Sequence, residues 1–163
     1  MAGFDTFTTF HTILSLIWLA AGIPVVAGLI HSRMSNAWTV IFLASGILTC
    51  VTGFFFPSPF MPSHVVGILS LIVLLLAVLG LYVFRLAGAW RWIYAVSMVV
   101  ALYFDAFVAV AQLFMKVPVF HALAPTQADP PFAIAQTIVL LIFAWLIYAS
   151  AKRFHPGLAA GAH

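Results

Sequence analysis

Charged residues are scarce in this sequence. The chain has six Lys or Arg residues and three acidic residues, and every acid is an aspartate. A soluble domain is about 25% charged, whereas this chain is 6% charged and 66% apolar, with a mean hydropathy of +1.23. The composition therefore excludes an ordinary water-exposed surface and predicts an integral membrane protein in contact with the lipid bilayer. Six dispersed cations form no basic patch, so no nucleic-acid partner is expected.

Cysteine is also nearly absent. The single cysteine, Cys50, lies within an apolar run, which excludes a disulfide within the chain and a cysteine-rich metal motif. No C-x-x-C-H motif is present, so any haem would be a non-covalent haem b. The start MAGFDTF lacks a basic n-region, and we expect the first helix to act as its own insertion signal.

Long apolar runs fill most of the chain and predict an all-α bundle of five transmembrane helices. Each run is long enough to cross a hydrocarbon core of about 30 Å. The expected helices span about 7–30, 37–56, 64–84, 90–115 and 132–151. They form one predicted domain, 1–154, followed by a disordered tail, 155–163. Asp5 or Thr6 is expected to cap the first helix and Ser63 the third.

The few charges predict the orientation of the bundle. With five spans, one side carries five basic residues: Arg33, Arg85, Arg91, Lys152 and Arg153. The other side carries Lys116, Asp5 and Asp129. Basic residues favour the cytoplasmic side. We therefore expect the N-terminus outside and the C-terminus in the cytoplasm of a bacterial inner membrane.

Asp105 stands out because it lies near the middle of the fourth expected helix. Along that helix it is about 21 Å from Arg91 and about 16 Å from Lys116. An ionisable group at this depth is costly, so it marks a candidate site and faces other helices. Gln112 follows seven residues later, on the same polar stripe. Gln136 on the fifth helix lies at nearly the same depth and is the expected hydrogen-bond partner.

Two interpretations of Asp105 follow. In the structural one, a neutral, protonated Asp105 joins the last two helices through Gln136, a contact worth about 0.6–2 kcal/mol. In the functional one, Asp105 carries protons or contacts a quinol, with Gln112 and His121 above it. The structural interpretation is favoured.

Histidines gather at the predicted outer face. His11 precedes Arg33 by 22 residues and His64 precedes Arg85 by 21, so the two share one depth. His121 follows the fourth helix on the same side. Paired imidazoles on separate helices are typical of haem b ligation, and His11, His64 and His121 are the candidate metal ligands. Amphipathic histidines also occur at helix ends without any ligand.

Three stretches carry a resemblance: TGFFFPSPFMPSHVVGILSL, LAGAWRWIYAVSMVVALY and KVPVFHALAPTQADPPFAIAQ. Together they resemble an uncharacterised family of small five-helix bacterial inner-membrane proteins. The resemblance implies a bacterial source and a stand-alone five-helix unit. It implies no activity, substrate or catalytic residue.

Two function classes remain open. The first is a small redox protein that binds haem b or a metal near the outer face and interacts with a quinone-like partner. The second is a non-catalytic accessory or scaffold subunit that binds another membrane protein. Whether the protein is an enzyme stays open. A transporter ranks third, because 163 residues without an inverted repeat would need to oligomerise to build a path.

Overall fold

The computed structural model describes residues 2–56 and 62–156, with the side chains of residues 2–5, 62 and 63 left undescribed. Within these ranges the chain is helical and contains no strand. In order, the elements are α1 (Ala2–Ile30), α2 (Asn36–Gly53), α3 (Pro62–Val78), the π-helical turn η1 (Leu79–Val83), α4 (Trp90–Lys116), α5 (Pro118–Leu123) and α6 (Pro130–Arg153). Five of these helices are long and apolar enough to cross a membrane, which indicates a multi-pass membrane protein.

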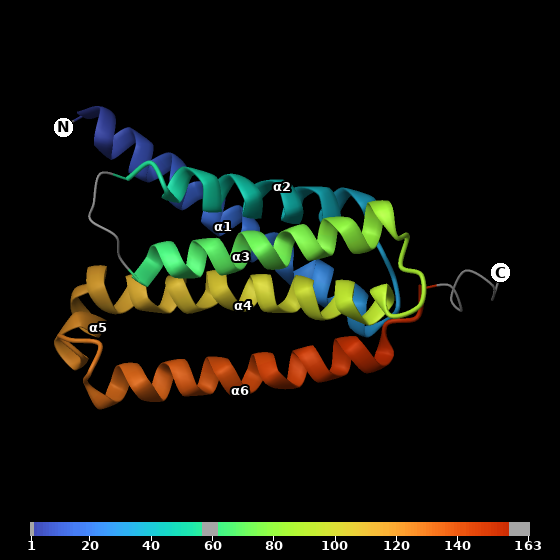
Figure 1. The fold of residues 1–163 in the computed structure, drawn as a ribbon. Helices are drawn as coiled ribbons and strands as arrows, with labels where there is room; N and C mark the ends of the chain where they lie inside the picture. The colour runs from blue at the N-terminus through green and yellow to red at the C-terminus, as the bar shows by residue number, and fades with distance from the viewer. Residues whose placement is uncertain (1, 57–61, 157–163) are drawn as a thin grey trace.

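The five long helices run up and down in one bundle, with the two termini at opposite ends (Figure 1). The α4 helix lies at the centre of the packing, because it contacts α1, α3, α5 and α6. Its buried residues recur at helical spacing and include Tyr94, Met98, Ala101 and Asp105. The α6 helix lies at the edge of the bundle, mainly against α4 (Figure 1).

Two glycines let α1 approach its neighbours closely. A Cβ atom at Gly22 would lie 2.4 Å from the Leu102 side chain of α4. A Cβ atom at Gly46 of α2 would lie 2.8 Å from the Trp18 ring, which is itself buried. Small residues at these positions allow the close helix contacts that are typical of membrane bundles.

Several predicted boundaries were wrong. The α1 helix begins at Ala2, before Asp5 and Thr6, so neither residue caps it. The α2 helix ends at Gly53 instead of residue 56, and α6 runs from Pro130 to Arg153, beyond both predicted ends. The segment after α4 forms the short helix α5, where no helix was predicted. The Ser63 side chain lies outside the described residues.

The end of α6 is tied to the rest of the bundle. The Arg91 guanidinium of α4 donates to the carbonyls of Ala151 (3.2 Å) and Phe154. The Ser32 hydroxyl donates to the Arg153 carbonyl at 3.0 Å and accepts from the His155 N–H. Of the predicted disordered tail, only residues 155 and 156 lie within the described part of the chain.

Candidate functional site: a buried aspartate among four helices

Asp105 is buried in the middle of the bundle, with 4% of its surface exposed. Its Oδ1 atom accepts a hydrogen bond of 2.7 Å from the Ser15 hydroxyl of α1. Its Oδ2 atom is also buried, and no hydrogen-bond partner reaches it. The carboxyl group is therefore satisfied on one oxygen only.

The predicted bond between Asp105 and Gln136 is absent. The Gln136 amide instead donates to the Phe107 carbonyl of α4 at 3.0 Å, and its own Oε1 is buried without a partner. Counting residues from the helix ends gave the depth of the two side chains but not their rotation about the helix axes. Asp105 faces α1, whereas Gln136 reaches the backbone of α4.

The other two predicted neighbours of Asp105 also lie elsewhere. Gln112 is exposed. His121 is exposed on α5, and its Nδ1 lies 3.3 Å from the Phe114 carbonyl. Neither residue joins Asp105 in a polar route.

Buried polar side chains of α2 and α3 lie in the same part of the bundle as Asp105. Beside Ser15 of α1, the thiol of Cys50 on α2 lies near the Ser70 hydroxyl of α3 and within electrostatic range of Asp105. Cys50 and Ser70 are both buried. We call Ser15, Cys50, Ser70 and Asp105 the central polar cluster. Sequence reasoning missed Ser15, although its position four residues after His11 was a usable signal.

His11 lies one helical turn from Ser15 on the same face of α1. Its Nδ1 is 2.8 Å from the Thr52 hydroxyl of α2. That hydroxyl has one hydrogen, and it donates to the carbonyl of Leu48 or Thr49 (2.7 and 3.1 Å). In the tautomer that fits this arrangement, His11 Nδ1 donates to Thr52 and Nε2 is the acceptor nitrogen of a neutral ring.

The His64 and His11 rings both lie at the end of α2. The His64 ring packs against Phe54 at 5.9 Å between centroids, whereas the His11 ring packs edge-on against Phe56 at 5.1 Å. Among the described residues, no three His, Cys, Asp or Glu side chains gather as metal ligands, so His11, His64 and His121 form no common group.

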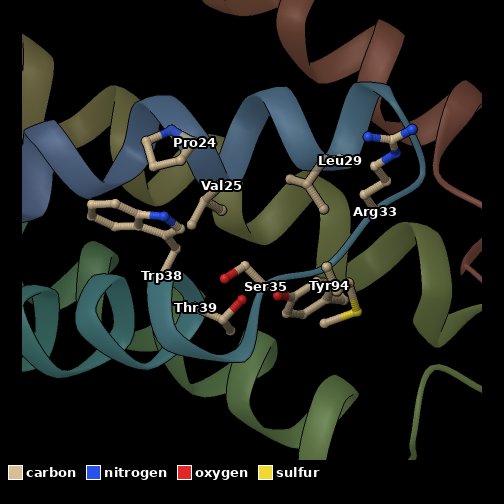
Figure 2. Close-up of a pocket in the computed structure, with 9 residues that line it drawn as sticks. Pro24, Val25, Leu29, Arg33, Ser35, Trp38, Thr39 and Tyr94 are labelled. Atoms are coloured by element: carbon tan, nitrogen blue, oxygen red, sulfur yellow. The ribbon is translucent and has the colours of Figure 1, made fainter.

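A small cavity lies at the opposite end of the bundle from His11. Its volume is about 10 Å³, which is room for about one water molecule. Figure 2 shows it between α1 and the start of α2, and it is lined by Pro24, Val25, Leu29, Arg33, Met34, Ser35, Trp38, Thr39 and Tyr94. The cavity is too small for a haem or a quinone ring.

No family model, curated protein or solved structure matches this chain. The resemblance to small five-helix bacterial membrane proteins therefore stays a prediction from the sequence.

Proposed function

We propose that this protein is a proton-exchanging membrane protein in which Asp105 takes up and releases a proton within the bilayer. The observation that carries the proposal is the half-satisfied carboxyl group: Ser15 donates to Oδ1, and Oδ2 is buried without a partner.

A purely structural role explains this arrangement poorly. A carboxyl group that only joined helices would be expected to use both oxygens, because a buried polar atom without a partner costs about 1–3 kcal/mol. Asp105 makes one side-chain bond across the bundle, to Ser15, and none to Gln136. Ionisable groups inside a membrane are by default candidates for function. The missing partner on Oδ2 favours that interpretation here.

The geometry also indicates which oxygen carries the proton. Since the Ser15 hydroxyl donates to Oδ1, the lone pairs of Oδ2 remain available. A neutral Asp105 holds its proton on Oδ2, and the ionised form keeps the Ser15 bond. The same hydrogen bond therefore holds the side chain in position in both protonation states.

A lipophilic partner of the quinone type is part of the proposal as an expectation from the sequence, as are a bacterial inner membrane and an outer N-terminus. Haem b and a bound metal remain predictions from the sequence, with His11 and His64 as the candidate ligands. An optical spectrum before and after dithionite tests them directly.

Carbodiimide labelling tests proton exchange at Asp105. Dicyclohexylcarbodiimide modifies protonated carboxyl groups in apolar surroundings and adds a defined mass to the peptide. We expect labelling of Asp105 in the purified protein to fall as the pH rises and to be absent in Asp105→Asn. Asp129→Asn is the matched control and should keep the label. Labelling that is equal at every pH, or absent at every pH, would overturn the proposal.

The accessory-subunit interpretation is the second candidate, and one observation favours it. Only 17% of the most apolar window of α6 is buried within the bundle. One exposed row of α6 has the 4, 3, 4, 3 spacing of a helix-pairing seam and comprises Ile134, Ile138, Leu141, Trp145 and Tyr148. A membrane partner that co-purifies in fixed ratio and is lost in Leu141→Trp, but not in the α3 control Leu75→Trp, would establish it.

A further inference from the structure

We propose that His11 is the group through which Asp105 exchanges its proton with the N-terminal end of the bundle. This inference rests on the proposed function. It names the residues along which the proton moves and the end of the bundle at which it enters and leaves.

A row of polar side chains leads along one face of α1 to Asp105. Thr8, His11 and Ser15 recur at spacings of three and four residues, which places them on one helix face. The Thr8 Oγ1 atom is buried without a hydrogen-bond partner. His11 is half-buried, and Ser15 bonds directly to Asp105. His11 and Ser15 are about 6 Å apart along the axis, a distance that one water molecule can bridge. In the proposed route water carries the proton between His11 and Oδ2 of Asp105, while the Ser15 hydroxyl keeps its bond to Oδ1.

The hydrogen bond to Thr52 prepares His11 for this role. In the tautomer whose Nδ1–H donates to the Thr52 hydroxyl, the ring accepts a further proton on Nε2. Accepting it leaves the Thr52 bond intact, since Nδ1 is a donor in both forms of the ring. A Cβ atom at Gly53 would lie 3.4 Å from His11 Cε1, so the ring lies close against α2. The ring thus keeps one orientation in its protonated and neutral forms.

The described neighbours of His11 come from two helices. The ring bonds to Thr52 and packs on Phe56 at the end of α2, and Lys116 of α4 lies within electrostatic range. Asp105 is the acid at the inner end of the proposed route, where Ser15 bonds to its Oδ1. In this route the proton rests on Asp105 and passes through His11.

The same helix face offers no comparable route to the other end. Beyond Ser15, the buried side chains of α1 are those of Trp18, Ala21, Val25, Val26 and Leu29. The Leu102 side chain packs directly against Gly22 on this stretch of α1. These side chains have no group that can accept and release a proton near neutral pH. Exchange through α1 is therefore one-sided.

Infrared spectroscopy of the protein in liposomes measures this exchange. The C=O stretch of a protonated carboxyl group shifts in D₂O, and the Asp105→Asn variant identifies the band. We expect rapid exchange in the unmodified protein and exchange about a hundredfold slower in His11→Ala, the lower end of the usual effect of a positioned acid–base group. Added imidazole should restore the rate in His11→Ala.

Two further variants separate proton transfer from structure. His11→Gln can still donate to Thr52 but cannot carry a proton, so it should exchange as slowly as His11→Ala. His31→Ala, at the other end of α1, should exchange like the unmodified protein. Unchanged exchange in His11→Ala, or normal exchange in His11→Gln, would overturn the route while leaving proton exchange at Asp105 in place. An Asp105 band that never responds to pH in the unmodified protein would instead refute the proposed function itself.

Discussion

The Ser15–Asp105 hydrogen bond allows the sharpest test of the central polar cluster. Ser15→Ala removes the hydroxyl that donates to Oδ1 at 2.7 Å and leaves neither carboxyl oxygen with a partner. Removing the partner of a buried acceptor costs about 1–3 kcal/mol, and more when the acceptor is charged. We therefore expect Ser15→Ala to lower the free energy of unfolding by about 2 kcal/mol.

The matched control lies on the same helix. Thr12→Ala also deletes one hydroxyl from α1, but that hydroxyl is exposed and donates only to the Thr8 carbonyl one turn earlier. It should change stability by less than about 0.5 kcal/mol. Reversible unfolding in mixed micelles, followed by circular dichroism, compares the two variants. Equal stability of Ser15→Ala and Thr12→Ala would refute the claim that Ser15 supports Asp105.

Three other predictions follow from the structure. Gly46→Ala should destabilise the bundle by about 1–3 kcal/mol and change Trp18 fluorescence, because the new Cβ would lie 2.8 Å from the indole. Gly67→Ala is the control and should have a mild effect, because its Cβ would lie 3.4 Å from Phe54. Denaturation in micelles measures both variants. Alkaline phosphatase fused after Gln127 should be active and fused after Ala87 inactive, and the reverse pattern would place His11 on the cytoplasmic side. Asp105→Asn should fold normally, because the amide oxygen still accepts from Ser15, yet lose proton release in liposomes; retained proton release would show that Asp105 is structural.

The sequence was sufficient to predict the helices because hydropathy and length decide where a chain crosses a bilayer. Five apolar runs became five long helices, and Trp90 begins α4 as expected. Their ends were harder to predict. Asp5 and Thr6 looked like capping residues, but α1 continues past them to Ala2. Local capping preferences are worth about 1 kcal/mol, which an extended helix can easily offset.

The partner of Asp105 could not be predicted for a geometrical reason. Residue counts place a side chain along a helix to within a few ångströms, and on that measure Gln136 was a suitable partner. They do not give the rotation of one helix against another, and each residue turns the helix by about 100°. Ser15 faces Asp105 because of the way α1 packs on α4, with a close approach at Gly22, and these two helices are far apart in the sequence.

The histidines show what depth alone can and cannot establish. His11 and His64 were paired because they lie equally far from basic residues, and their pairing as haem ligands stays a prediction. In the structure, the His11 ring contacts Thr52 and Phe56 at the end of α2. His11 also lies on a helix face that leads from Thr8 through Ser15 to Asp105. A periodicity of three and four residues on α1 therefore carries more functional information than the shared depth of two helices, because it describes groups that one rigid helix holds in fixed order.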